Sequence, residues 1–208
     1  MLRRKLRRLR IRLGPDGKEI LRLHDGVEGL LAVEESAFLF HSARGRRTIV
    51  EIGSYRGKSC VLLGRGSRAC GAPGAHVTAI DPHGINHAGD RTRFSDEDAR
   101  KFDENVRREG LAEDVDHWIM TSRDALPKWQ AGNRAIDMLW IDGDHSYEAV
   151  RFDLSAWTPL VAPGGMVAAH DYAHRGDVKR AWDEVMSDPD RWEPTRFVRS
   201  IAWTVRRS

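Results

Sequence analysis

The chain has 208 residues, of which 40% are hydrophobic and 31% are charged, and its formal net charge is +3. This length suits one well-buried domain rather than two domains with linkers, and no apolar run approaches the roughly 20 residues that span a bilayer. The two cysteines, Cys60 and Cys70, belong to no zinc-binding pattern, so we expect a reduced, cytoplasmic protein.

The first thirteen residues, MLRRKLRRLRIRL, form a basic N-terminal arm with seven basic residues and no acid. The arm lacks the apolar segment of a secretion signal. Because it accounts for more than the whole net charge, the remaining body is near neutral, and we do not expect a general nucleic-acid surface. The arm could contact anionic lipid at a membrane periphery, RNA or an acidic partner subunit, or it could be a solvated tail.

Residues 14–208 read as a single domain. Residues 14–17 predict a turn, and the apolar spacing of residues 27–42 predicts a cap helix. Strands and helices are then predicted to alternate over residues 48–52, 57–69, 76–80, 95–109, 115–120, 123–130, 136–141, 146–157 and 165–169. A further helix over residues 177–186 precedes two strand-like runs, at 192–198 and 201–205.

This alternation predicts a doubly wound α/β fold with a mostly parallel seven-stranded sheet and helices on both faces. The last two strands predict a closing C-terminal antiparallel hairpin. On the helix over residues 146–157, we expect Tyr147 and Trp157 in the core and Asp153 on the polar side.

The segment IVEIGSYRGKS, residues 49–59, predicts a strand that runs through a glycine turn into a helix. Gly53 and Gly57 would let the backbone pass close to a ligand, and Ser54 or Lys58 could cap the helix. The spacing matches neither the dinucleotide fingerprint nor the phosphate loop, so a pyrophosphate-binding loop is disfavoured.

Carboxylates near the first strands favour a nucleoside ligand. Glu51 lies within the first strand, and Asp81 ends the second, where it could accept both hydrogen bonds of a ribose diol. Asp124, with Ser122 beside it in the SRDAL segment, could contact an adenine amino group. Together these residues would bind an adenosine without phosphates.

Two polar clusters follow the next two apolar strands. Asp142, Asp144 and His145 follow the fourth strand, and His170 and Asp171 follow the fifth. Ligands of open α/β sheets bind outside the carboxyl ends of the strands, so these side chains should converge on one crevice. That crevice could hold a metal ion or an acid–base pair, although Asp142 could instead cap the following helix and His145 could be only a structural partner of Asp142 or Asp171.

From residue 49 to residue 186 the chain resembles the class I S-adenosylmethionine-dependent methyltransferases. The resemblance rests on the glycine turn, Asp81 and the segments SRDAL, IDGDHSYEAV, APGG and HD in that order. Within this class the chain is similar to small metal-dependent O-methyltransferases, which include macrolide-sugar and polysaccharide-sugar enzymes, and to cephalosporin-hydroxylase-type proteins. The alternative is a nucleotide-binding α/β domain with a different ligand.

The resemblance implies a Rossmann-like methyltransferase domain with a cofactor-binding half over residues 48–131 and a metal and acceptor half over residues 136–208. It implies S-adenosylmethionine as the cofactor, bound by Glu51, Gly53, Ser54, Tyr55, Gly57, Ser59, Asp81, Ser122, Arg123, Asp124 and Asp142. It also implies a divalent metal ion, Mg²⁺ in the relatives, with Asp142, His170 and Asp171 as ligands.

His145 matches the position of the family's catalytic base, and an imidazole that titrates near neutral pH suits proton removal from a hydroxyl. His170 departs from the oxygen ligands usual at its position. A nitrogen donor makes Mn²⁺, Fe²⁺ or Zn²⁺ more plausible than for an all-oxygen site, unless His170 lies outside the ligand set.

A carbohydrate is the acceptor that the sequence favours, because the residues expected at the mouth of the crevice are polar. They are His83, His87, Arg91, Arg93, Tyr172, His174 and Arg175. We also expect a homodimer. RNA methylation is an alternative suggested by the basic arm, but the near-neutral body and the absence of an Asn-Pro-Pro-Tyr type of motif disfavour it. A non-catalytic cofactor-binding subunit of a tailoring enzyme is a further alternative.

Overall fold

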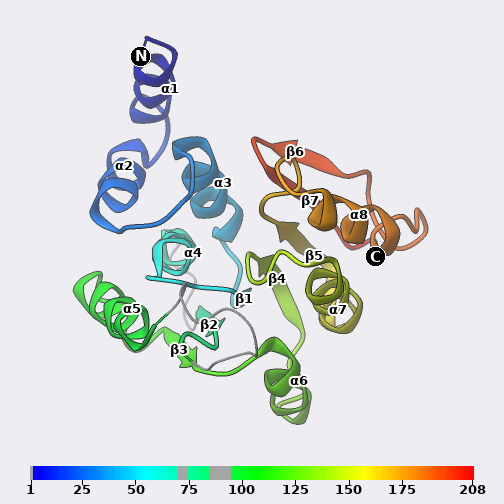
Figure 1. Cartoon of the computed structure of the whole chain (residues 1–208). Coiled ribbons are helices and arrows are strands. Elements are labelled where there is room, and N and C mark those ends of the chain that lie inside the picture. The colour runs from blue at the N-terminus through cyan, green and yellow to red at the C-terminus, as the bar shows by residue number, and fades with distance from the viewer. Residues whose placement is uncertain (1, 70–74, 85–94) are drawn as a thin grey trace.

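The computed structural model describes residues 2–69, 75–84 and 95–208, and within them seven strands form one sheet in the order β3-β2-β1-β4-β5-β7-β6 (Figure 1). The parallel strands are β1 (Thr48–Ile52), β2 (His76–Ile80), β3 (Val115–Trp118), β4 (Ile136–Ile141) and β5 (Val161–Ala169). β7 (Ile201–Val205) runs antiparallel to β5 and pairs with β6 (Arg196–Val198). The predicted fold and its closing hairpin are therefore confirmed.

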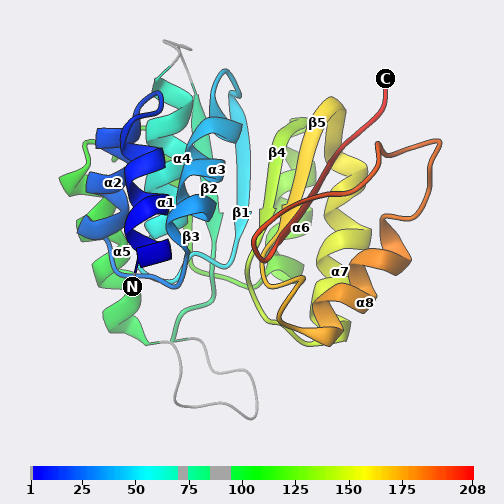
Figure 2. The same cartoon turned by 90° about the horizontal axis from the view of Figure 1, so that it is seen from above.

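Helices cover both faces of this sheet (Figure 2). The first group is α1 (Leu2–Arg12), α2 (Gly17–Gly26), α3 (Val33–Ala43), α4 (Lys58–Arg68) and α5 (Asp96–Arg108). The second group is α6 (Ser122–Ala131), α7 (Tyr147–Trp157) and α8 (Gly176–Val185), with the short 3₁₀ helix η1 (Thr158–Leu160) after α7. Each face has its own apolar core, and tryptophans fill much of the core beneath the second group.

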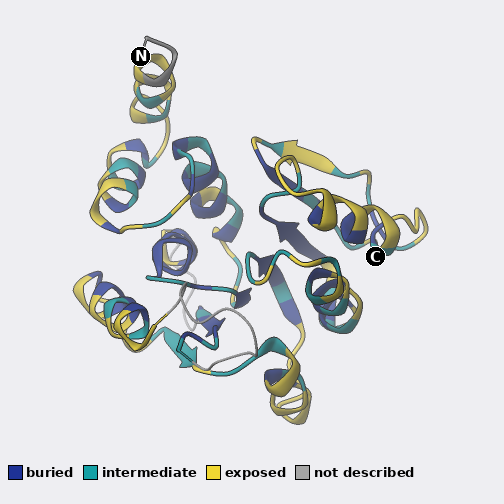
Figure 3. Cartoon of the chain, in the orientation of Figure 1, coloured by how far each residue is buried: buried dark blue, intermediate teal, exposed yellow. Residues whose placement is uncertain are grey.

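β1, β2 and β4 are buried on both faces over most of their length, which explains their largely apolar sequences, whereas every residue of the edge strand β3 is partly exposed. In β4, Met138 and Trp140 enter the core on one face, whereas Leu139 and Ile141 enter the core on the other. This is the alternation that a strand imposes on successive side chains. Figure 3 shows the buried strands at the centre and the exposed residues on the outer helices.

Strand order reverses between β1 and β4. On one side of β1 lie β2 and β3, and on its other side lie β4 and β5. In open α/β sheets the crevice at such a reversal is the usual ligand site. The glycine turn follows β1, and the polar clusters at residues 142–145 and 170–171 follow β4 and β5. The topology therefore positions all three segments at one edge of the sheet.

The predicted cap helix over residues 27–42 was wrong at its amino end, since α3 begins at Val33. Helix α2, which ends at Gly26, was not predicted from the sequence. Gly26 and Gly29 disfavour a continuous helix here, and the Glu35 carboxylate accepts a hydrogen bond from the Ala32 amide at the first turn of α3.

Strand bounds also differ in the second half of the chain. β5 begins at Val161 rather than residue 165, with a register shift opposite Ile136–Met138, so the Pro-Gly-Gly segment is part of the strand. β3 ends at Trp118. The strand predicted over residues 192–198 is reduced to Arg196–Val198, because Pro194 cannot donate to a ladder.

The basic arm is a helix that contacts the rest of the domain. Arg8 pairs with Asp25, Arg7 lies 3.1 Å from Glu34, and Ile11 packs against the core. In the described part of the chain, no helix is long and apolar enough to cross a membrane.

Candidate functional site

The turn after β1 requires glycine, because neighbouring protein atoms leave no room for a Cβ. Gly53 has φ +84°, and a Cβ there would lie 2.3 Å from the carbonyl oxygen of Asp142. Gly57 has φ +83° and is itself the N-cap of α4, with no side-chain cap. The prediction that Ser54 or Lys58 caps this helix was therefore wrong. Gly53 allows the close approach of β1 to the loop after β4.

Asp81, at the end of β2, fixes the shape of this turn. Its Oδ2 accepts hydrogen bonds from the backbone amides of Ser54 at 2.7 Å and Tyr55 at 2.9 Å, and its Oδ1 accepts one from His83 at 2.8 Å. A carboxylate has about four lone-pair positions, so beside these three bonds Asp81 can accept about one more, from one hydroxyl of a diol. The residue predicted to bind the ribose thus also holds the backbone around the ligand position.

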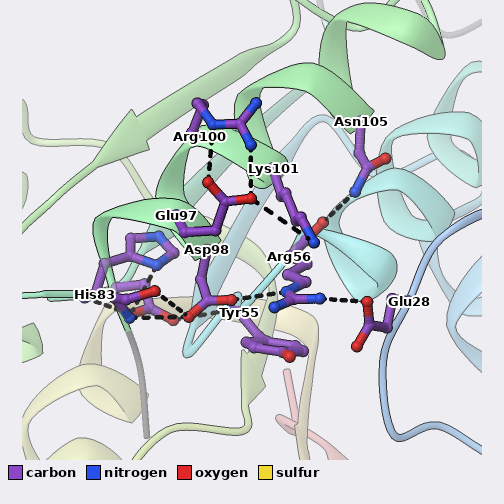
Figure 4. Close-up of polar contacts among 11 residues, drawn as sticks. Glu28, Tyr55, Arg56, His83, Glu97, Asp98, Arg100, Lys101 and Asn105 are labelled. Carbon is purple, nitrogen blue, oxygen red and sulfur yellow. Dashed lines mark hydrogen bonds and ion pairs between the residues drawn. The ribbon is translucent and has the colours of Figure 1, made fainter. Parts of the chain in front are cut away.

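Arg56 ties the same turn to two other segments (Figure 4). Its Nε donates to Oδ1 of Asp98 on α5 at 2.7 Å, and its guanidinium also pairs with Glu28. Asn105 donates to the Arg56 carbonyl oxygen at 2.8 Å. These contacts join residues 28 to 49 positions apart, and no local sequence pattern indicated them.

Glu51 lies completely buried within β1, beside Ser54 and Ser59. Burial raises the pKa of its carboxyl to about 8, and the nearby charges of Asp142 and Asp81 act in the same direction. The carboxyl is therefore mostly protonated at neutral pH. Its predicted contact with the cofactor stays a prediction.

The SRDAL segment has partners of its own at the start of α6. Thr121 donates from its hydroxyl to Asp124 at 2.6 Å, and the Asp124 amide donates back to Thr121. Arg123 stacks on Phe152, with its guanidinium carbon 3.8 Å from the ring centroid. The predicted cofactor contacts of Arg123 and Asp124 also remain predictions.

Asp153 was predicted on the polar side of α7, and this was wrong. Its side chain is buried and accepts a hydrogen bond of 2.5 Å from the Ser122 hydroxyl, which links α7 to α6. Burial raises the pKa of Asp153 to about 7. Ser122 was predicted as a cofactor contact, but its hydroxyl donates this hydrogen bond to Asp153. Trp157 is in the core as predicted. Tyr147 is half-buried and packs against that core.

The polar residues after β4 and β5 meet at the sheet edge. Asp142, His170 and Asp171 each offer a ligand atom, and these atoms lie within 4.8 Å of one another. His145 is beside them, with its Nε2 3.2 Å from Oδ2 of Asp171 and 3.6 Å from Oδ1 of Asp142. Asp171 has a φ of +58°, a conformation often retained at functional sites. All four predicted metal and base residues are thus neighbours.

His170 is the most buried member of this cluster. Its Nδ1 lies 3.2 Å from Oδ1 of Asp142, and its Nε2 lies 3.3 Å from Oε2 of Glu35. Burial lowers the pKa of His170, but the hydrogen bonds and charges of Asp142 and Glu35 outweigh it and bring the pKa to about 10.

Glu35 is a site residue that the sequence analysis missed. It is 3% exposed, and its Oε1 accepts from the Ser200 hydroxyl at 2.6 Å and from the Ser200 amide at 3.0 Å. Burial raises its pKa, whereas His170, Ser200 and Ala32 together outweigh burial and lower it to about 2. Glu35 therefore joins α3 and the β6–β7 turn to His170.

The mouth of the crevice differs from the prediction at His83. This side chain is buried, with its Nε2 2.8 Å from Nε2 of His117, whose Nδ1 is 2.8 Å from Asp103. His174 is exposed, and its Nδ1 lies 3.3 Å from Asp171. Tyr172 and Arg175 lie in the same segment after β5. The remaining residues predicted at the mouth, His87, Arg91 and Arg93, are outside the described residues.

Comparison with known proteins identifies both the domain and the fold. A family model described as a methyltransferase domain matches residues 50–172. Among solved structures, an O-methyltransferase from Bacillus cereus in complex with SAH is 18% identical, with a TM-score of 0.68 over 94% of this chain and 93% of that chain. The O-methyltransferase TomG from Streptomyces achromogenes, involved in tomaymycin synthesis and solved with SAM, is 15% identical, with a TM-score of 0.67 over 92% and 89%. The O-methyltransferase NovP is 22% identical, with a TM-score of 0.67 over 85% and 81%.

Proposed function

The chain belongs to the family of methyltransferase domains, and on this premise we propose that it is an S-adenosylmethionine-dependent O-methyltransferase. We further propose that it acts on a sugar hydroxyl and uses a divalent metal ion. The observation that carries this proposal is the cluster of Asp142, His170 and Asp171, with His145 at its side.

The first half of the domain supports the cofactor assignment. Asp81 retains about one acceptor position for a ribose hydroxyl, and it holds the turn that begins at Gly53. The Arg56 network fixes the far end of the turn. The bound complexes of the Bacillus cereus and Streptomyces achromogenes proteins, which contain SAH and SAM, support the same ligand class.

The donor atoms of the cluster suit a divalent ion. Two carboxylates and one imidazole nitrogen form a mixed set that Mn²⁺, Fe²⁺ or Zn²⁺ accepts readily, while Mg²⁺ prefers oxygen ligands throughout. A bound divalent ion would supply positive charge that lowers the pKa of an acceptor hydroxyl and orients it. Asp142 and Asp171 would hold the ion, together with Nδ1 of His170 once that atom has given up the proton that it shares with Asp142.

His145 is the group that we assign to proton removal. The residue is half-buried, and its Nε2 atom is covered and lies 3.2 Å from Oδ2 of Asp171. A sulfonium methyl donor is already a strong electrophile that leaves as a neutral thioether. The protein therefore has to align the acceptor oxygen with the methyl group and remove the hydroxyl proton.

A carbohydrate fits the polar residues that follow β5. His174 and Arg175 are exposed and can donate hydrogen bonds to hydroxyl groups, whereas half-buried Tyr172 donates its own hydroxyl hydrogen to Asp183 at 2.8 Å. Tyr172 packs on Phe197 with ring centroids 5.0 Å apart, which would provide an apolar surface for a sugar ring. A flat catechol needs a more apolar slot than these residues provide.

Methyl transfer to a panel of acceptors tests this function. The purified protein is incubated with methyl-labelled S-adenosylmethionine and Mn²⁺ or Mg²⁺, together with deoxy sugars, nucleotide sugars, oligosaccharides, catechols or RNA. We expect label on a saccharide hydroxyl and its loss in EDTA, with recovery when metal is restored. Labelling confined to catechols or RNA would contradict the acceptor class, and transfer that persists in EDTA would contradict the metal requirement.

A further inference from the structure

Helix α1 has one face that attaches it to the domain. Ile11 packs against the core, and Gly17 at the start of α2 approaches the Ile11 carbonyl so closely that a Cβ would lie 1.9 Å from its oxygen. Arg7 and Arg8 pair with Glu34 and Asp25 on the same side. The helix is thus held at a defined place on the domain, where it stands out at the periphery (Figure 1).

Among the residues from Lys5 onward, whose side chains the structure describes, the opposite face of α1 exposes three leucines. Leu6 is 56% exposed, Leu9 is 51% exposed and Leu13, just after the helix, is 78% exposed. At 100° per residue, their spacing of three and four places them within an arc of roughly 60°. Exposed basic side chains at Lys5, Arg10 and Arg12 flank this arc on both sides, and Figure 3 shows this helix as largely exposed.

We propose that this face of α1, defined by Leu6, Leu9, Leu13, Lys5, Arg10 and Arg12, docks the enzyme on the surface of a membrane rich in anionic lipid. The leucines enter the boundary between headgroups and acyl chains, and the basic residues contact the anionic headgroups. This combination of an apolar stripe with flanking Lys and Arg is the pattern of helices that lie in the plane of a membrane interface.

The composition and shape of the face favour lipid over other partners. Nucleic acid would use the basic residues but would leave the leucines in water. A second copy would bring one basic face against another, which opposes association. The leucines form a ridge on a projecting helix, and a bilayer accepts such a ridge without a matching groove.

Vesicle co-sedimentation tests the proposal with the full chain. The vesicles are phosphatidylcholine alone or phosphatidylcholine with 30% phosphatidylserine, at moderate ionic strength. One variant combines Leu6→Gln, Leu9→Gln and Leu13→Gln, and another combines Lys5→Gln, Arg10→Gln and Arg12→Gln. Glutamine keeps helix propensity, and thermal unfolding checks that each variant folds like the wild type.

We expect the wild type to bind the anionic vesicles and not the neutral ones. Each basic residue near an anionic surface contributes roughly fivefold in affinity, so the basic triple variant should bind roughly 100-fold more weakly. The leucine triple variant should also lose binding. A control with Arg47→Gln, Arg107→Gln and Lys128→Gln removes the same charge elsewhere and should bind like the wild type.

Three outcomes overturn the proposal. The first is a wild type that does not bind anionic vesicles. The second is a leucine variant that binds them as well as the wild type, which would indicate a purely electrostatic contact. The third is a control variant that loses as much binding as the basic α1 variant, because attraction would then come from overall charge.

Discussion

A His145→Gln variant is expected to lose about 10²- to 10⁴-fold in kcat, which is the usual contribution of a positioned general base. Glutamine preserves polarity and approximate length but cannot take a proton from the acceptor. S-adenosylmethionine affinity should change little, because His145 is not among the residues expected to contact the cofactor, although it lies 3.6 Å from Asp142, which is. Single-turnover methyl transfer and cofactor titration measure the two quantities separately.

His174 provides the matched control for this substitution. It is a second imidazole near Asp171, at 3.3 Å, but its side chain is 65% exposed. We expect His174→Gln to retain most of the kcat and to raise the KM for the acceptor, because His174 is one of the residues proposed to bind the sugar. The base assignment fails if His145→Gln turns over like the wild type, or if both variants lose the same activity.

Replacement of Glu35 by Ala should destabilise the domain strongly. The substitution removes the acceptor for Ser200 and Ala32 and leaves buried His170 with one carboxylate partner fewer. Loss of one member of a buried charged pair typically costs about 3–5 kcal/mol in the free energy of unfolding. Denaturant unfolding near pH 6 measures this value, and Glu34→Ala is the control, because Glu34 is less buried and pairs with exposed Arg7.

The pH dependence of the Glu35→Ala effect has a definite sign. The pKa of Glu35 is lowered from 4.5 to about 2, so its contribution is complete above pH 4.5 and is lost as the pH falls toward 2. The pKa of His170 is raised from 6.5 to about 10, so its contribution is complete below pH 6.5 and is lost as the pH rises toward 10. The difference between wild type and variant should therefore be largest between pH 4.5 and 6.5. A difference that stays constant from pH 3 to pH 9 would contradict the pairing.

Local sequence patterns were sufficient to predict the bounds of most central strands of the sheet. β1, β2, β4 and β7 have the predicted bounds, because short apolar runs that end at turn residues or polar clusters define them within a few positions. The convergence of Asp142, His170 and Asp171 was also predictable. It follows from parallel pairing of β4 with β5, which aligns the carboxyl ends of the two strands.

Contacts between residues far apart in the chain could not be predicted from local sequence patterns. Glu35 meets Ser200 across 165 positions, and it reads in the sequence as one of two adjacent acids on a helix. Asp153 has an ordinary helical spacing, and only the packing of α6 on α7 gives it a buried partner in Ser122. The Arg56 network likewise depends on where α5 packs. In each case the partner is set by tertiary structure.

Titration of Mn²⁺ into the protein saturated with S-adenosylhomocysteine, followed by electron paramagnetic resonance of the free ion, tests the proposed metal site most directly. We predict one bound ion per chain in the wild type and at least about tenfold weaker binding in Asp171→Asn, because Asn loses the ligand charge. Asp144→Asn, which changes an exposed carboxylate two residues from Asp142, should bind like the wild type. A wild type that binds no Mn²⁺, or equal weakening in the two variants, would contradict a metal site formed by Asp142, His170 and Asp171.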